Sequence, residues 1–369
     1  MRLLWISGRT IGKDLAGTTE KSLTRELIDH GCELTFVSPG RLPHDGVTNI
    51  QVSTINFPGL ITLSGARQIR KSLGDIDLSK FDIALIDWRY VLPLQKFIRS
   101  LRIPWCVIDR GPPATSGIIG GKIRRELLRN LQKKFWERAW KISEDCASMG
   151  FVVSKNHETI VRGFAPKLPI RAIPAGSYPA KKEVKKEDPS VILRLAYVGR
   201  IDRKRGVYSI LQLSEELKER GVDHLISIAG DGNLKNKLEK SSSGSGNFLF
   251  LGKLEEEGVE ELLAGQHVGI MPMPDIPVWR ISSPLKLAEY LSYGMAIVGP
   301  QHPGNAIDDD GEYSMLTSEG PWFEDAAEKL SSRISRDWGS VTKSAIRSSE
   351  RLSWENIGES FMKELEKII

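Results

Sequence analysis

The sequence has few cysteines and no long apolar run. Its three cysteines, Cys32, Cys106 and Cys146, are odd in number and lack partners at the spacing of a metal site. This pattern excludes a disulfide framework and a structural zinc site, so we expect reduced, mostly buried thiols. No apolar run approaches the roughly 18 residues that a membrane-spanning helix needs. We therefore expect a cytoplasmic protein.

The length and composition are those of a folded protein with more than one domain. The chain has 369 residues, of which 40% are hydrophobic and 27% are charged, so it can bury substantial cores and is not disordered. At roughly 100 to 200 residues per domain, two domains are expected.

Charge is distributed unevenly between the two halves. Residues 1–180 contain 27 Lys and Arg against 16 Asp and Glu, a net charge of +11, and the remaining residues carry −6. Such asymmetry indicates an anionic partner for one half: a nucleic acid, a membrane surface or a phosphorylated substrate. Stacking aromatics do not interrupt the basic residues, so we expect no nucleic-acid partner.

Short apolar runs alternate with helical patterns in the first half of the chain. An apolar run at residues 3–6 precedes a helical pattern over 18–30, which Gly31 ends. Such apolar strands between helices predict a parallel sheet covered on both faces. Further strands are expected at residues 33–38, 83–86, 105–108 and 151–153.

The alternation stops at residues 179–190 and then restarts. This segment is charged, bracketed by prolines and without an apolar face, which indicates a linker. The predicted domains are therefore 1–178 and 191–348. A C-terminal helix in 349–369 is expected to pack on one of the two domains, either back on the N-terminal domain or on the second. Strands are expected at residues 193–198, 225–229, 248–251, 268–271 and 296–298, and helices at 207–220, 234–240, 259–264 and 284–293.

The most specific motif is SSPLKLAEY at residues 282–290. Serine at the N-cap and Pro284 at the first helical position predict a helix start whose free N–H groups bind an anion, such as a phosphate. Glu289 lies on roughly the same helix face as Leu285, where its carboxylate can accept hydrogen bonds from sugar hydroxyls. The alternative is that Glu289 pairs with Lys286 on a solvated face.

A basic motif, GRIDRKRG at residues 199–206, follows the predicted strand 193–198. In open α/β sheets, ligands bind beyond the carboxyl ends of the strands. Arg200 and one of Lys204 or Arg205 are therefore positioned to hold a diphosphate. A solvated basic loop would show the same pattern.

Taken together and in this order, these motifs resemble the GT-B glycosyltransferases of group 1, the retaining, nucleotide-sugar-dependent GT4 class. Residues 283–294 match the SPLKLxEY pattern of a subgroup. The resemblance implies an α/β fold of the GT-B type, with two doubly wound Rossmann-like domains facing a central cleft. Comparable turns occur at residues 16–21, 104–111, 153–154, 173–176, 230–232 and 251–253.

The resemblance also implies roles for residues of the second domain. Arg200, Arg205 and Lys204 would act in catalysis by neutralising the donor diphosphate, which backbone amides at Ser283 to Leu285 would also contact. Glu289 would bind the ribose hydroxyls, and the backbone of residues 252–254 would meet the base. The donor-binding set that the resemblance implies is Gly17, Gly199, Gly230, Gly252, Lys253, Leu254, Ser282, Ser283, Pro284, Leu285 and Glu289.

In the first domain, Gly17 would let a loop approach the diphosphate or the acceptor closely. Asp109 and Arg110 lie in the loop that usually carries a His-Gly or Arg-Asp pair, and we group them with the acceptor side without assigning a catalytic base. Many members also place a glutamate eight residues before Glu289, where this chain has Ile281. Arg280 or Ser282 is expected to substitute for it.

The resemblance predicts a glycosyltransferase of the hexosyltransferase type (EC 2.4) that needs no cofactor. It would move a sugar from a nucleotide-diphosphate-sugar to a glycan or lipid-linked acceptor, with retention at the anomeric carbon. Three aspartates at residues 308–310 are expected to be solvated, and no metal is expected. The alternatives are a nucleotide-sugar epimerase of the same architecture and a GT-B-like binding subunit without activity.

Residues 122–141 form a basic amphipathic pattern with eight Lys and Arg against two Glu. One interpretation is docking on the anionic headgroups of the inner membrane face, which would bring a lipid-linked acceptor to the enzyme. The other is an ordinary domain helix with a solvated basic face.

Overall fold

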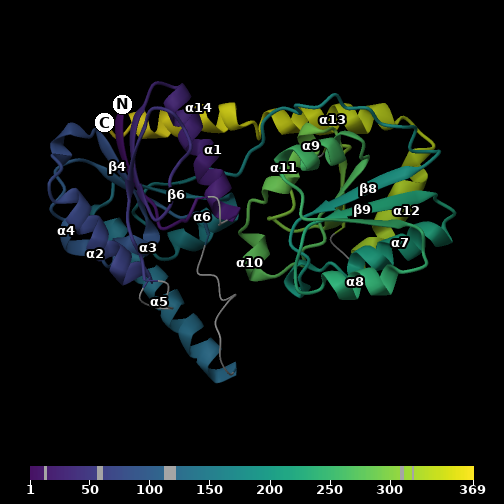
Figure 1. Cartoon of the computed structure of the whole chain (residues 1–369), viewed down its shortest axis with the longest axis horizontal. Helices are drawn as coiled ribbons and strands as arrows, with labels where there is room; N and C mark the ends of the chain where they lie inside the picture. Colours follow the sequence, from purple (N-terminus) through teal and green to yellow (C-terminus); the bar gives the residue numbers. More distant parts are fainter. Residues whose placement is uncertain (12–14, 56–60, 112–121, 308–310, 318–319) are drawn as a thin grey trace. The chain divides into compact units, whose positions relative to one another are not determined.

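The computed structural model describes residues 1–11, 15–55, 61–111, 122–307, 311–317 and 320–369 (Figure 1). The predicted acidic stretch 308–310 lies outside this described part. Contacts divide the chain into two compact units: unit 1 comprises Met1–Pro174 with Ile357–Ile369, and unit 2 comprises Ala175–Asn356.

Unit 1 is built on a parallel sheet of seven strands within the described residues, in the order β3-β2-β1-β4-β5-β6-β7. The core of this unit lies against its central strands, where all residues of β4 and β5 are buried. The strands are β1 (Arg2–Ile6), β2 (Glu33–Ser38), β3 (Val47–Gln51), β4 (Ile83–Asp87), β5 (Trp105–Ile108), β6 (Met149–Val152) and β7 (Ile170–Ala172).

Helices cover this sheet, and the last helix of the chain is among them. Phe361 of α14 packs edge-on against Phe151, with ring centroids 4.8 Å apart, and against Trp5 at 6.4 Å. The helices of unit 1 are α1 (Leu15–Asp29), α2 (Ile61–Leu73), the 3₁₀ turn η1 (Leu78–Lys80), α3 (Trp88–Val91), α4 (Gln95–Ile98), α5 (Lys122–Cys146), α6 (Lys155–Arg162) and most of α14 (Trp354–Glu366).

Unit 2 repeats the design with six parallel strands among the described residues, in the order β10-β9-β8-β11-β12-β13. The strands are β8 (Leu193–Val198), β9 (His224–Ala229), β10 (Phe248–Gly252), β11 (Val268–Ile270), β12 (Ala296–Pro300) and β13 (Ser314–Thr317). The helices are η2 (Arg203–Arg205), α7 (Ser209–Glu219), α8 (Lys235–Ser242), α9 (Glu256–Ala264), α10 (Pro277–Arg280), α11 (Leu285–Ser292), α12 (Trp322–Ile334) and α13 (Trp338–Glu350).

The segment expected to be a linker, residues 179–190, contains no helix or strand in the described structure. Its lysines contact α9: Lys181 lies 2.7 Å from Glu260, and Lys182 lies 3.3 Å from Glu257. These ion pairs hold the segment against α9 of unit 2.

The predicted strands agree with the structure to within two residues at each end, and less apolar elements were missed. β2, β5 and β8 match their predicted ranges residue for residue. The missed strand β3 has the sequence VTNIQ and is half exposed at the sheet edge. An edge strand has no need of a continuous apolar run, so its pattern resembles that of a loop.

In each unit the strand order reverses at one point. The reversal lies between β1 and β4 in unit 1 and between β8 and β11 in unit 2. Loops that leave neighbouring strands diverge to opposite faces at such a point, which makes the carboxyl edge there the usual ligand site of a doubly wound sheet. The residues just after β8, β1 and β4 are therefore the first candidates for a functional site.

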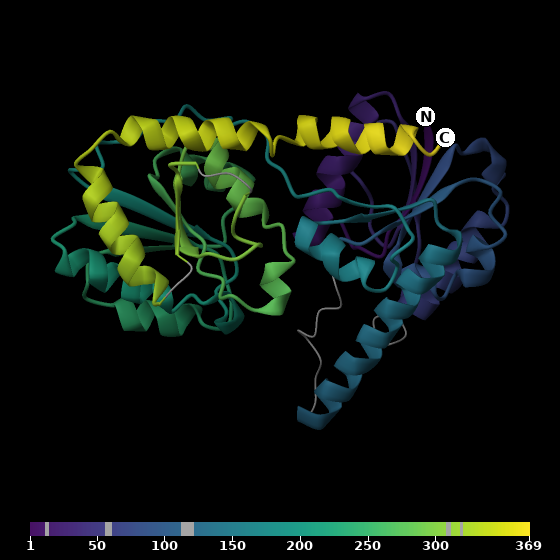
Figure 2. The same ribbon diagram turned by 180° about the vertical axis from the view of Figure 1, so that it is seen from behind.

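The helix α5 is the basic amphipathic segment. In both views its first half extends away from the rest of unit 1 (Figures 1 and 2). Its second half is anchored by Trp136 and Trp140, which are buried. Within the described residues, no helix is both long enough and apolar enough to cross a membrane.

Candidate active site

Glycine turns meet at the carboxyl edge of the unit 2 sheet. The backbone N–H of Gly199, just after β8, donates to the carbonyl of Ala229, and the N–H of Gly230, just after β9, donates to the carbonyl of Gly252 at 2.6 Å. A Cβ atom on Gly230 would lie 1.8 Å from the carbonyl oxygen of Gly199. The fold therefore brings the predicted residues Gly199, Gly230 and Gly252 together.

Two guanidinium groups converge on Asp202 in the loop after β8. The Asp202 carboxylate caps η2 by accepting from the backbone N–H of Arg205 at 3.2 Å. The Nε atoms of Arg200 and Arg205 each lie 3.8 Å from its Oδ2. The Arg200 side chain is 65% exposed and that of Arg205 is 17% exposed. Arg200 can therefore turn toward a ligand, whereas Arg205 is held in place.

Trp279 of α10 holds this loop, and the sequence analysis missed it. Its indole Nε1 donates to the carbonyl of Lys204 at 2.8 Å, and the guanidinium of Arg205 lies 5.0 Å from its ring centroid. The Lys204 side chain itself is exposed. Trp279 lies far from the loop in sequence, so only the folded chain reveals the contact.

The start of α11 differs from the prediction. Pro284 occupies the N-cap and Leu285 is the first helical residue, so the expected serine cap with proline at the first position is wrong. The Ser283 hydroxyl instead accepts from the backbone N–H of Ala175 at 2.8 Å. No described side chain caps the helix, which leaves its first N–H groups open to a ligand.

Glu289 and Lys286 lie on α11, but they do not form the solvated pair that spacing also allows. Glu289 is half-buried, and burial raises the pKa of its carboxyl group while Lys286 opposes that rise. Lys286 is only 8% exposed, and its ammonium lies 4.4 Å from the ring centroid of Tyr197. Within the described structure, its Nζ has no hydrogen-bond partner.

The residues expected to replace the missing glutamate have other partners. Arg280 contacts both carboxylate oxygens of Asp275, at 2.9 and 3.1 Å. The Ser282 hydroxyl donates to the carbonyl of Trp279 at 2.7 Å. Ile281 is 5% exposed and packs inside the unit. In this conformation, therefore, both Arg280 and Ser282 are engaged by other groups of the protein.

The segment expected to meet the base, residues 252–254, follows β10. Gly252 has a φ of 66°, in the left-handed region that favours glycine. The Lys253 side chain is 78% exposed and lies 3.8 Å from Glu255, and Leu254 is half-buried. Residues 252–254 are therefore only partly buried, which is compatible with the predicted base contact.

In unit 1, the expected position of Gly17 is wrong. We predicted that it lies in a loop before the first helix, but α1 begins at Leu15 and Gly17 is buried in its first turn. A Cβ atom on Gly17 would lie 3.3 Å from the Cα of Ile11. The glycine therefore serves close packing between the helix and the chain that precedes it.

A buried acidic cluster lies at the reversal point of unit 1, and the sequence analysis missed it. Glu20 of α1, 1% exposed, accepts a hydrogen bond from the Ser7 hydroxyl just after β1. Burial and the nearby Asp87, at the end of β4, raise the pKa of Glu20 to about 7. Asp87 is itself held by Arg89 at 2.8 Å. Helical spacing alone does not indicate that Glu20 faces two strand ends.

Asp109 and Arg110 are held by the interior of unit 1. Asp109 is fully buried and accepts from the indole N–H groups of Trp136 at 2.6 Å and Trp140 at 3.1 Å. His157 lies 3.4 Å from the same carboxylate. Burial by itself would raise the pKa of Asp109, but His157 and the hydrogen bonds outweigh this effect and lower it. The Arg110 guanidinium donates to the carbonyl of Ile173 at 2.5 Å, and burial lowers its pKa to about 10.

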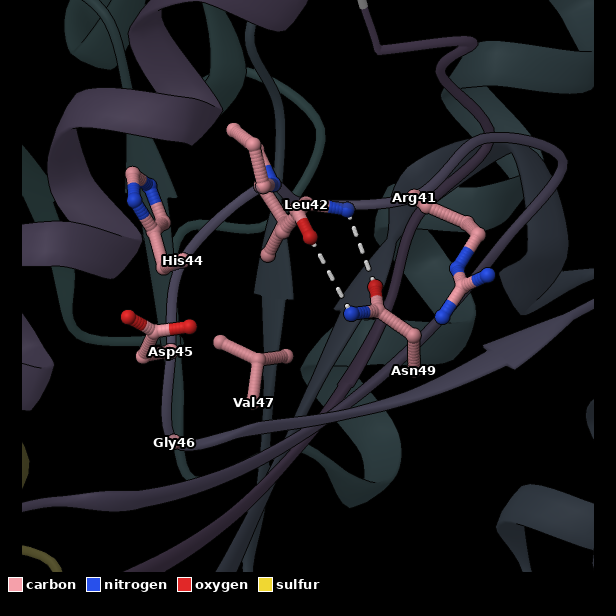
Figure 3. Close-up of a pocket in the computed structure, with 8 residues that line it drawn as sticks. Arg41, Leu42, His44, Asp45, Gly46, Val47 and Asn49 are labelled. Carbon is pink, nitrogen blue, oxygen red and sulfur yellow. Dashed lines mark hydrogen bonds between the residues drawn. The ribbon is translucent and has the colours of Figure 1, made fainter.

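A separate hollow lies along the loop that connects β2 to β3 (Figure 3). Asn49 braces its wall, since its amide accepts from the N–H of Leu42 at 2.9 Å and donates to the Leu42 carbonyl at 3.1 Å. None of the residues predicted for the site lines it. In the described part of the chain, no group of three His, Cys, Asp or Glu side chains could hold a metal ion.

Residues 193–336 match the family model described as "Glycosyl transferases group 1". This range covers β8 to α12 and includes the basic loop and α11. No curated protein sequence matches the chain significantly.

Solved structures are similar over the whole chain at low sequence identity. They include a sucrose-phosphate synthase from Thermosynechococcus elongatus (12% identity, TM-score 0.71, covering 99% of this chain and 98% of that chain). The lipopolysaccharide outer core galactosyltransferase WaaB is 13% identical, with a TM-score of 0.70 and full coverage of both chains. HepE from Anabaena, solved with UDP and glucose, is 12% identical, with a TM-score of 0.69 and full coverage of both. The predicted GT-B fold is confirmed, and residues 193–336 are similar to the group 1 glycosyl transferases.

Proposed function

We propose that this chain, whose residues 193–336 match the group 1 glycosyl transferase family model, is a retaining glycosyltransferase. It would use a nucleotide-diphosphate-sugar donor and a glycan or lipid-linked acceptor. The observation that carries the proposal is the arrangement at the carboxyl edge of unit 2. There, Arg200 and Arg205 flank one carboxylate in the loop after β8, and the uncapped start of α11 belongs to the same unit.

The chemistry requires stabilisation of a departing diphosphate. The bond between the anomeric carbon and the diphosphate oxygen breaks, the acceptor oxygen bonds to that carbon, and the acceptor proton passes to the diphosphate on the same face. Negative charge therefore develops on the diphosphate, and fixed positive groups stabilise it most. Arg200 and Arg205 supply such charge, while the amides of Leu285 and Lys286 add the positive end of the helix dipole.

Other parts of the donor would contact neighbouring residues. Glu289 would accept hydrogen bonds from the ribose hydroxyls, and the backbone of residues 252–254 would meet the base. Because guanidinium groups take the role of a counter-ion, the reaction is expected to proceed without a metal. Unchanged turnover in the presence of EDTA would support this expectation, and a loss that magnesium restores would contradict it.

The acceptor is proposed to be lipid-linked because of α5. Leu127 and Leu131 are 60% and 54% exposed, although leucine is usually buried. Arg129 and Lys133 on the same stretch are 56% and 66% exposed. Exposed leucines among basic side chains fit the interface of an anionic membrane, where both kinds of group are satisfied.

A thermal-shift screen tests the proposal. UDP, GDP, ADP, CDP and their glucose conjugates are added to the protein, and a ligand at 100 times its dissociation constant should add about 2.7 kcal/mol of stability. UDP is the first choice, since the similar HepE structure contains it. Failure of every nucleotide to stabilise the protein would contradict the proposal.

A nucleotide-sugar that stabilises the protein then separates the alternatives. A transferase hydrolyses the donor slowly and transfers its sugar when the acceptor is present, and NMR of the anomeric proton shows whether configuration is retained. An epimerase converts the donor without an acceptor. An inactive binding subunit binds the nucleotide but gives neither product.

A further inference from the structure

A half-buried lysine, Lys186, and a buried one, Lys286, lie at opposite ends of α11 and differ in their partners. Lys186 is at the carboxyl end, where its Nζ donates to the carbonyl of Gly294 at 2.8 Å. Lys286 is in the first turn, and its Nζ has no hydrogen-bond partner among the described residues. Burial lowers the pKa of both lysines to about 7.

The position of Lys286 is electrostatically unfavourable without an anion. A helix carries partial positive charge at its amino end and negative charge at its carboxyl end, so the dipole favours Lys186 and opposes Lys286. Arg205 adds a second positive charge near Lys286. The carboxylates of Glu289 and Asp202 favour the charged form of Lys286 and so oppose this effect, but neither forms a hydrogen bond with the ammonium.

The ammonium of Lys286 points to the loop after β8. A Cβ atom on Gly199 would lie 3.3 Å from its Nζ. Gly199 and Tyr197, whose ring lies under the ammonium, frame the carboxyl end of β8. Lys286 thus lies at the same strand end from which Arg200 and Arg205 emerge, and an anion held there would give it the missing partner.

We propose that Lys286 binds a phosphate oxygen of the donor diphosphate. The inference rests on the proposed function, because that function supplies the diphosphate. Lys286 would form a charge-assisted hydrogen bond with the bound donor and would add a third positive side chain to Arg200 and Arg205. In the free protein, the lysine is held in place by its packing against Tyr197.

Calorimetry with UDP and with inorganic pyrophosphate tests this role. Lys286→Met keeps most of the length of the side chain and removes its charge, and Lys186→Met is the matched control at the other end of the helix. Lys286→Met should weaken UDP binding at least tenfold, while Lys186→Met should leave it within about twofold. Equal UDP affinity in the wild type and Lys286→Met would overturn the proposal and leave the proposed function standing.

The two ligands keep the proposals distinguishable. Pyrophosphate binding that depends on Lys286, without binding of UDP, GDP, ADP or CDP, would support the phosphate contact and contradict the nucleotide donor. Failure of pyrophosphate and of all four nucleoside diphosphates to bind the wild type would overturn both proposals.

Two further readouts separate binding from a merely structural role. At pH 8 the Lys286 amine is mostly neutral in the free protein, so UDP binding should take up a proton, and Lys286→Met should abolish that uptake. Calorimetry in buffers of different ionisation enthalpy measures this proton uptake.

Without ligand, Lys286→Met should raise the unfolding midpoint at pH 7, whereas Lys186→Met should lower it by leaving the Gly294 carbonyl unpaired. A lower midpoint for Lys286→Met, with uptake unchanged, would assign the lysine a structural role.

Discussion

Gly230 lies so close to Gly199 that a Cβ atom at position 230 would be 1.8 Å from the Gly199 carbonyl oxygen. The contact joins the first two loops at the carboxyl edge of the unit 2 sheet. It sets the path of the chain into Arg200 and the basic loop.

Gly230→Ala should therefore disrupt the site as well as the fold. Both the clash and the φ of 148° oppose the change, and together they should destabilise unit 2 by about 3 kcal/mol or more. Gly221→Ala is the control, since Gly221 also has a positive φ, of 69°, but would meet no atom within 4 Å. It should cost about 1 to 2 kcal/mol. Chemical denaturation measures both, and equal losses would contradict the role of the close contact.

Arg200→Ala should lower turnover by about a hundredfold to a thousandfold, the usual effect of removing one charge-stabilising donor. The Arg200 side chain is 65% exposed, so the unfolding midpoint should stay unchanged. Arg203→Ala in the same loop, also exposed, is the control and should retain activity. A donor-hydrolysis or transfer assay measures the rates, and full activity of Arg200→Ala would remove this residue from the site.

Glu20 should make stability depend on pH. Its pKa is about 7 in the folded protein against an ordinary value of 4.5, so the folded state holds a proton that the unfolded state releases between these values. Stability should accordingly fall by about 3 kcal/mol as pH rises from 4.5 to 7, because each pKa unit corresponds to about 1.36 kcal/mol. Glu20→Gln should be relatively more stable at the upper end of this range. Denaturation of both proteins across the range gives the difference, and a constant difference would show that Glu20 titrates normally.

The double variant Leu127→Gln and Leu131→Gln should lose binding to anionic liposomes without losing stability, since both leucines are more than half exposed. Ile346→Gln on α13 is the control, with a side chain that is 41% exposed. Co-sedimentation at low salt measures the effect. If the double variant sediments like the wild type, α5 is an ordinary domain helix with a solvated basic face.

The sequence predicted the central parts of both sheets because buried parallel strands are near-continuous apolar runs. Leu3 to Ile6, for example, are fully buried in β1. It also predicted which residues gather at the carboxyl edge of unit 2, since Gly199, Gly230 and Gly252 each follow or end such a strand. The cap of α11 was predicted wrongly, because Ser283 accepts from Ala175, a partner that local spacing does not reveal.

What the sequence determined by itself, then, is the alternation of strands and helices and the class of fold, because local periodicity and turn residues carry that information. Tertiary structure alone decided which polar groups are deprived of water. Glu20 and Lys286 look like ordinary helix-surface residues in sequence, and each acquires its shifted pKa only when the ends of the strands close around it. Desolvation depends on every neighbour in space, and most of those neighbours are distant along the chain.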